Sequence, residues 1–132
     1  MKPVVITVGP LRFTARFEHA KAPQTCAAFA ARLPFEGDLI QARWSGESAW
    51  SPLGDLQLGG PVENATSHPS RGDILFYQAA ASESEILFPY GSTHFASKVG
   101  QLAGKHMLTL TSGHELLPEL GRMVLWDPVV RG

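Results

Sequence analysis

The chain has 132 residues, of which 44% are hydrophobic and 17% are charged, and its formal net charge is −1. A chain of this size and composition can bury one core, so we expect a single domain spanning residues 1–132 and no extended disorder. Its eleven Lys and Arg residues form no stripe and no basic amphipathic helix, which argues against nucleic-acid and membrane-surface partners.

The first two elements predict a β-hairpin. Val4–Val8 is a β-branched run that ends at Gly9-Pro10, a turn pair. Leu11–Phe17 alternates apolar and polar residues, as a half-buried strand does. The first run is too short for a signal peptide or a membrane span. We therefore expect a cytoplasmic protein.

A helix is predicted over Ala22–Leu33. Pro23 suits a first helical position, apolar residues recur at helical spacing, and Pro34 ends the element. Cys26 lies within this apolar pattern and is the only cysteine, so no intrachain disulfide and no cysteine-based zinc site can form. We expect Cys26 to be a small buried hydrophobe.

The rest of the chain predicts short strands separated by turns. Residues 46–70 are rich in Gly, Pro, Ser and Asn, and a stretch of that length is expected to contain short strands or to be functional. One further helix is expected at His114–Leu120, ending at Gly121. The remaining expected strands are Asp38–Ser45, Ile74–Tyr77, Glu85–Phe88, His94–Val99, Met107–Thr111 and Met123–Trp126. About seven or eight short strands with two short helices predict a mostly-β fold, a small closed or nearly closed β-barrel.

Several segments resemble known proteins. Phe17-Glu18, Ala22-Pro23-Gln24-Thr25, Phe29 and Arg43 are similar to the start of the cyclophilins, in which the matching arginine belongs to the prolyl isomerase site. Residues 43–47, 71–77, 95–100 and 121–126 more closely resemble a family of uncharacterised bacterial proteins with a trimmed cyclophilin-like barrel. The resemblance implies a cyclophilin-like fold and a bacterial source but no activity. Only the arginine of the isomerase pocket is recognisable, so prolyl isomerase activity is not expected.

One group of candidate site residues lies on either side of Gly46, and Glu85 is added to it from a later strand. Arg43 offers fixed donors suited to a carboxylate, phosphate or amide carbonyl, with an ion pair or a solvated face as the alternative. Trp44 and Trp50 flank a polar segment that includes Glu47, where aromatic rings often line pockets but also cap cores. Glu85 begins a strand and would orient a polar ligand beside Arg43, unless it is an ordinary surface carboxylate.

A second group lies along a glycine-rich stretch and consists of Tyr90, His94, Lys98, Gln101 and His106. Loops on a rigid barrel often carry function, although each of these residues alone is common at a surface. His94 and His106 have no third ligand at a recognisable spacing, so no metal is expected. No P-loop and no nucleophile elbow occurs, and no cofactor is expected.

Three hypotheses follow. The first is a binding protein that holds a small polar or anionic metabolite at the barrel face around Arg43. The second is an enzyme, either a residual prolyl isomerase or an acid–base catalyst, with Arg43 and Glu85 as the candidate catalytic residues. The third is a structural domain that acts by forming homo-oligomers, with a two-fold dimer as the commonest form. The ligand site predicted by the first hypothesis consists of Arg43, Trp44, Glu47, Trp50, Glu85, Tyr90 and Lys98.

Overall fold

A computed structural model describes residues 3–42, 44–53, 58–78, 84–97, 100–126 and 130–131. The helical elements are α1 (Pro23–Ala30), the 3-10 turn η1 (His114–Leu116) and α2 (Leu117–Trp126). The strands are β1 (Val4–Val8), β2 (Leu11–Phe17), β3 (Asp38–Gln41), β4 (Gly46–Pro52), β5 (Ala65–Thr66), β6 (Asp73–Tyr77), β7 (Glu85–Thr93), β8 (Ala96–Ser97), β9 (Gly100–Gln101), β10 (Gly104–Ser112) and β11 (Val130–Arg131).

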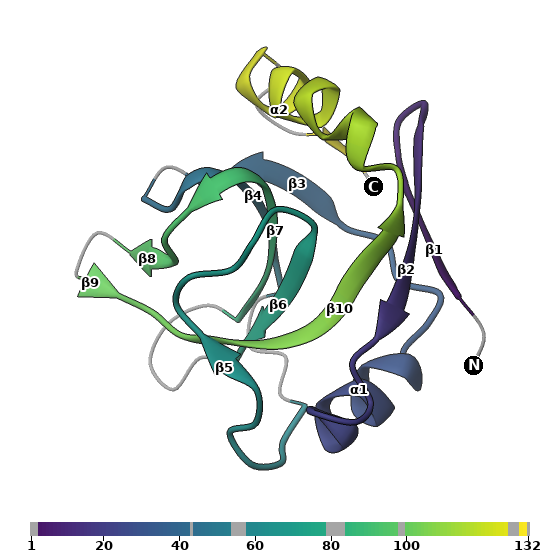
Figure 1. The fold of residues 1–132 in the computed structure, drawn as a ribbon, viewed down its shortest axis with the longest axis vertical. Coiled ribbons are helices and arrows are strands. Elements are labelled where there is room, and N and C mark those ends of the chain that lie inside the picture. Colours follow the sequence, from purple (N-terminus) through teal and green to yellow (C-terminus); the bar gives the residue numbers. More distant parts are fainter. Residues whose placement is uncertain are drawn as a thin grey trace.

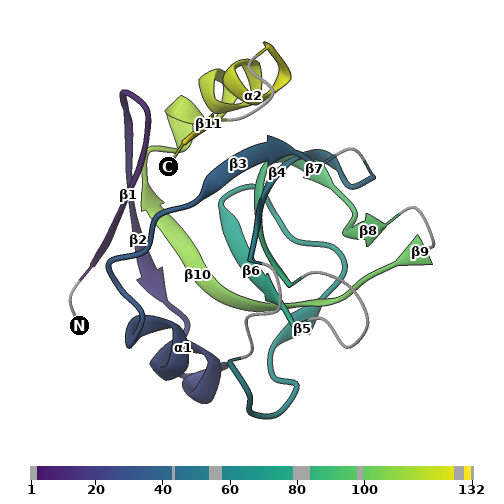
Figure 2. The ribbon, with the colours of Figure 1, turned by 180° about the vertical axis from the view of Figure 1, so that it is seen from behind.

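In the described part of the chain, nine of the strands form one antiparallel sheet that curls into a half-barrel (Figure 1), and β8 and β9 pair with each other as a separate two-stranded sheet. The order of the larger sheet is β1-β2-β10-β6-β7-β4-β3-β11, and β5 adds to β10. The two helices lie at opposite ends of this curled sheet, as the view from behind also shows (Figure 2). The mostly-β class with two helices is therefore confirmed. In the described part of the chain β1 pairs only with β2, so the sheet stays open between β1 and the β3–β11 edge.

The sheet buries side chains on both faces because successive strand residues point to opposite sides. The concave face carries the main core, which includes Phe13, Phe76, Phe88 and Met107. The convex face of β6 and β7 carries a smaller core around Leu75, Leu87, Phe95 and Ala42. The register explains this division, because Leu75 and Leu87 lie directly opposite each other and so share a face.

The predicted hairpin of β1 and β2 is confirmed, with Val8 opposite Leu11 across a two-residue loop. Gly9 has a φ of 55°, which suits the first position of a type II′ turn, and Pro10 supplies the negative φ that follows. Cys26 is fully buried, as expected, and its thiol donates to the Met107 carbonyl oxygen at 3.4 Å. Burial raises the pKa of Cys26 to about 11, which leaves the thiol protonated and unreactive.

Helix α1 begins without a capping side chain of its own, since Ala22 is its N-cap residue. Glu63 replaces that cap from a distant segment, because its carboxylate accepts the Thr25 backbone N–H at 2.6 Å. This backbone hydrogen bond lowers the pKa of Glu63. The contact ties the segment before β5 to the helix at the lower end of the sheet in Figure 1.

Within residues 46–70, which were expected to contain short strands or to be functional, residues 46–52 form β4, an interior strand of the sheet. One sequence prediction was wrong. Met123–Trp126 belongs to α2 rather than to a strand, because the helix continues through Gly121. A Cβ at Gly121 would lie 2.6 Å from the ring of Tyr90, so this glycine permits close packing of α2 on β7 rather than ending the helix. Neither helix in the described residues is long and apolar enough to cross a membrane.

Candidate functional site

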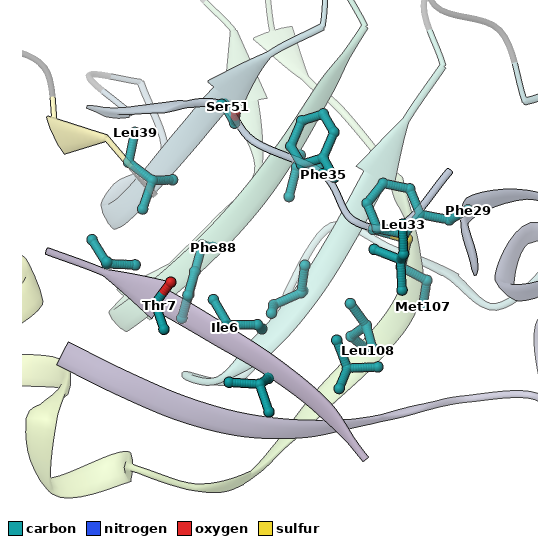
Figure 3. A pocket seen from close by; sticks show the side chains of 16 residues that line it. Ile6, Thr7, Phe29, Leu33, Phe35, Leu39, Ser51, Phe88, Met107 and Leu108 are labelled. Carbon is teal, nitrogen blue, oxygen red and sulfur yellow. The ribbon is translucent and has the colours of Figure 1, made fainter. Parts of the chain in front are cut away.

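The open side of the sheet contains an apolar cavity of about 160 Å³ (Figure 3). We call it the seam cavity, because it lies between β1 and the strands at the other end of the sheet order. Its walls come from β1, from the end of α1 with the following segment 31–37, and from the concave face of the sheet. The side chains that line it include Ile6, Thr7, Phe29, Phe35, Ser51 and Phe88.

The register of β4 against β7 determines which β4 side chains reach the cavity. Trp50 lies opposite Leu87 and packs against the small convex core. Ser51 lies opposite Ile86, whose side chain belongs to the main core, so Ser51 points to the concave side. The sheet therefore turns the tryptophan away from the cavity and the serine toward it.

The Ser51 hydroxyl is a polar group in an apolar environment. Ser51 is 5% exposed, and its Oγ has no hydrogen-bond partner among the described residues. A Cβ at Gly37 would lie 2.6 Å from this oxygen, so the absence of a side chain at Gly37 leaves the hydroxyl uncovered. A buried hydroxyl without a partner costs about 1–3 kcal/mol of desolvation. A ligand that bonds to Ser51 would recover part of that cost.

The size and lining of the cavity restrict what it can hold. No charged side chain lines it within the described part of the chain. Burial of an unpaired charge there would be costly, so the enclosed part of a ligand has to be neutral. An apolar cavity of about 150 Å³ in another protein binds benzene, so a volume near 160 Å³ accommodates a group of phenyl size.

The rim of the cavity reaches solvent. Val5 is 49% exposed and Leu33 is 39% exposed, and both residues line the cavity. The Thr7 side chain, on the exposed side of β1, contributes a second hydroxyl near the rim (Figure 3). Phe29 and Phe35 pack against each other on the opposite side, with ring centroids 5.8 Å apart. A ligand therefore has an entrance between β1 and the segment 31–37.

Two of the site residues predicted from the sequence lie together in another place, a shallow groove beside α2. Glu47 and Tyr90 line this groove together with Arg71 and Arg122. The Glu47 carboxylate accepts the Ser92 backbone N–H at 2.9 Å. The Tyr90 hydroxyl donates to the side-chain oxygen of Gln41 at 2.5 Å, and burial raises the pKa of Tyr90.

Three of the other predicted site residues, Trp44, Trp50 and Glu85, do not join this pair. Trp44 is 56% exposed, and Trp50 packs against the convex core. Glu85 starts β7 opposite Pro52, whereas Glu47 bonds near the far end of that strand, about 20 Å away at about 3.3 Å per residue. Arg43 and Lys98 lie outside the described residues. The described residues therefore do not bring Glu85 and Glu47 to one site.

A polar cluster joins β10 to its neighbours β2 and β6. The Thr109 hydroxyl donates to Glu18 at 2.6 Å and lies 2.8 Å from the His106 ring nitrogen. That nitrogen is 3.6 Å from an oxygen of Asp73, and Arg16 lies 3.3 Å from Glu18. The hydrogen bond from Thr109 is the main cause of a lowered pKa at Glu18. The Thr109 hydroxyl at the centre of this cluster therefore has a partner on each side.

Sequence reasoning did not identify Ser51, Gly37 or the edge of β1 as parts of a site. The available signal was the position of Ser51 directly after Trp50. Adjacent residues of a strand face opposite sides of the sheet, so the two side chains must lie on different faces. That signal was usable only if residues 46–52 were recognised as a strand. No group of three or more His, Cys, Asp and Glu side chains suited to a metal ion occurs among the described residues.

Comparison with known proteins identifies a family but no activity. The model of a family described as a protein of unknown function (DUF3830) matches residues 4–131. Comparison with curated proteins gave no match. Among solved structures, McbB in complex with tryptophan is similar in fold, with a TM-score of 0.75 and 15% sequence identity. The match covers 96% of this chain but only 42% of the McbB chain, so this chain spans less than half of that protein.

Proposed function

We propose, for a chain that belongs to the DUF3830 family of proteins of unknown function, that it binds a small neutral molecule in the seam cavity. The ligand has an apolar group of phenyl size and a hydroxyl or carbonyl that bonds to Ser51. One observation carries this proposal: the Ser51 hydroxyl is buried, has no partner among the described residues and borders an apolar cavity.

The cost of that hydroxyl supports a binding role. Proteins bond nearly all of their buried polar groups, and exceptions often occur where a ligand supplies the missing partner. An alanine at position 51 would avoid the cost of the unpaired hydroxyl. McbB, the relative in fold, was solved with tryptophan, which is itself an aromatic molecule, and this supports the choice of aromatic probes.

Calorimetric titration with two matched probes tests the proposal. Benzyl alcohol and toluene have rings of the same size, but only benzyl alcohol can bond to Ser51. At about 0.6 kcal/mol per non-hydrogen atom, the eight-atom alcohol is expected to bind with a Kd of about 0.3 mM. We expect toluene to bind about 5- to 10-fold more weakly, which corresponds to one net hydrogen bond.

Variants separate the cavity from the rest of the surface. Ser51→Leu fills the cavity and should abolish binding of both probes. Ser51→Ala should remove the preference for the alcohol, and Gly37→Ala should weaken it by placing a methyl group against the Ser51 hydroxyl. Ser48→Ala is the matched control, because Ser48 is also a buried serine without a partner among the described residues but does not line the cavity. Unchanged binding in Ser51→Leu would refute the proposal.

A second candidate is the polar or anionic metabolite that the sequence suggested. One observation favours it: Glu47 and Tyr90 share the groove beside α2 with two cationic side chains, Arg71 and Arg122. Such a ligand cannot enter the uncharged seam cavity. A carboxylate that binds to Ser51→Leu as well as to the unmodified protein, but does not bind to Arg71→Ala, would support the groove instead.

A further inference from the structure

The edge strand β1 leaves backbone groups available beside the seam cavity. Val8 and Leu11 close a two-residue hairpin loop, so they form a hydrogen-bonded pair in which each residue bonds to the other. Hydrogen-bonded pairs alternate along antiparallel strands, so Ile6 and Val4 also direct their backbone N–H and C=O toward β2. The backbone N–H and C=O of Val5 and Thr7 therefore point away from β2.

These outward groups meet no strand in the described part of the chain. β1 is at the end of the sheet order, and no backbone hydrogen bond joins it to β3 or to the segment 31–37. Val5 and Thr7 both line the seam cavity. The side chain between them, Ile6, points to the concave side and also lines the cavity (Figure 3). The same short stretch thus supplies an apolar wall and an unpaired peptide edge.

We infer that the cavity takes one aromatic amino-acid residue that carries an amide on each side, paired with β1 as a short antiparallel strand. This inference rests on the proposed function, because it assigns the chemical class of the ligand in the same cavity. In antiparallel pairing, a residue opposite Ile6 forms a non-hydrogen-bonded pair, and its side chain lies on the same face as that of Ile6. The aromatic group therefore enters the cavity.

The two flanking amides then bond to the residues on either side of Ile6. The carbonyl before the aromatic residue accepts the Thr7 N–H, and the N–H after it donates to the Val5 carbonyl. Recognition of this kind takes affinity from main-chain bonds and specificity from the pocket that receives one side chain. The uncharged lining favours an aromatic residue whose amino and carboxyl groups are both blocked as amides.

The probe is N-acetyl-L-phenylalaninamide, which contains one aromatic residue and both amides. Its D enantiomer is the matched ligand control, because the same amide contacts would direct its side chain away from the cavity. A dimethylamide in place of the terminal amide removes the donor to Val5 and keeps the ring. We expect the L form to bind about 10- to 30-fold more tightly than the D form, and the dimethylamide to lose about 5-fold.

Two substitutions at one position test the contact from the side of the protein. Thr7→Pro removes the outward N–H, and proline is tolerated on an edge strand where that N–H faces away from the sheet. Thr7→Val removes only the hydroxyl and keeps the N–H. Both variants lose the hydroxyl at the rim, but only Thr7→Pro loses the N–H, so we expect Thr7→Pro to bind the L probe about 5-fold more weakly than Thr7→Val does, and the two variants to bind benzyl alcohol equally.

The outcomes distinguish this inference from the proposed function. If benzyl alcohol binds through Ser51 but the L, D and dimethylamide probes bind equally, the cavity is a ligand site and the amide pairing is wrong. If neither the alcohol nor the L probe binds, the proposed function is wrong as well. If Thr7→Pro fails to fold, the comparison of the three amide probes on the unmodified protein still decides.

Discussion

Two regions of the sheet differ in the hydrogen bonding of a buried or half-buried hydroxyl. At the seam cavity, Ser51 has no hydrogen-bond partner in the described part of the chain, and its neighbours are aliphatic and aromatic. On β10, the Thr109 hydroxyl lies between Glu18 and His106 and bonds to both. One hydroxyl is left unpaired in an apolar cavity, and the other is at the centre of a charged network.

The difference separates a structural role from a binding role. The Thr109 cluster links β10 to Glu18, which directly follows β2, and to Asp73 of β6, so its bonds hold neighbouring segments of the sheet together. The Ser51 hydroxyl makes no hydrogen bond among the described residues that would stabilise the fold, and its desolvation opposes folding. Substitution of each hydroxyl should therefore change stability in opposite directions, which the following experiments measure.

The largest effect is expected from Thr109→Val. Valine keeps the shape and the strand preference of threonine but leaves Glu18 and His106 without the hydroxyl between them. We expect the free energy of unfolding at neutral pH to fall by about 1–3 kcal/mol, measured by urea denaturation.

The matched control for this substitution is Thr111→Val on the same strand. Thr111 is exposed, and its hydroxyl lies 3.1 Å from that of Thr14. Its loss should change stability by about 0.5 kcal/mol or less. Equal losses in the two variants would mean that the Thr109 cluster is no more important than a surface hydrogen bond.

A smaller effect of opposite sign is expected from Ser51→Ala. Removal of an unpaired buried hydroxyl should raise the free energy of unfolding by about 0.5–1 kcal/mol. Ser48→Ala should give a similar gain, since that hydroxyl is also buried without a partner among the described residues. Only Ser51→Ala should also lower affinity for benzyl alcohol. A loss of stability in Ser51→Ala would show that the hydroxyl already has a partner.

Parts of the fold follow directly from sequence patterns. The alternation over Leu11–Phe17 and the turn at Gly9-Pro10 predicted the hairpin, because each signal is local and the two agree. Pro23 and the helical spacing after it predicted α1 for the same reason. The mostly-β class was predictable because many short strands between turns leave few alternatives.

Other parts depend on contacts that a single sequence does not display. β4 has small and polar residues where a strand usually alternates, because its inward positions hold Ala49 and Ser51 against large residues from β7. Gly121 is a usual helix terminator, but the ring of Tyr90 occupies the space of its missing side chain. The seam cavity depends on the inward position of Ser51 in β4 and on the curl of the sheet, so Ser51 was not predictable as a site residue.

The last and smallest effect concerns pH, and it sharpens the contrast between the two hydroxyls. The hydrogen bond from Thr109 is the main cause of the lowered pKa of Glu18, with Arg16 and His106 contributing as nearby charges. A carboxyl group with a lowered pKa in the folded state stabilises the protein above its unfolded pKa of about 4.3, and this contribution is lost as the pH falls through the folded value. The cost of Thr109→Val should therefore be largest near neutral pH and shrink below about pH 4.

The seam cavity should show no such dependence. No titratable side chain lines it among the described residues, so the gain from Ser51→Ala should stay constant over the same pH range. Glu18→Gln provides the control, because in that background the cost of Thr109→Val loses its acid dependence, although Asp73 and His106 remain. Urea denaturation at several pH values measures the effect of Thr109→Val, the effect of Ser51→Ala, and the effect of Thr109→Val in the Glu18→Gln background. A cost of Thr109→Val that is flat with pH would mean that the bond to Glu18 does not depend on the carboxylate charge, and the contrast would then be one of packing alone.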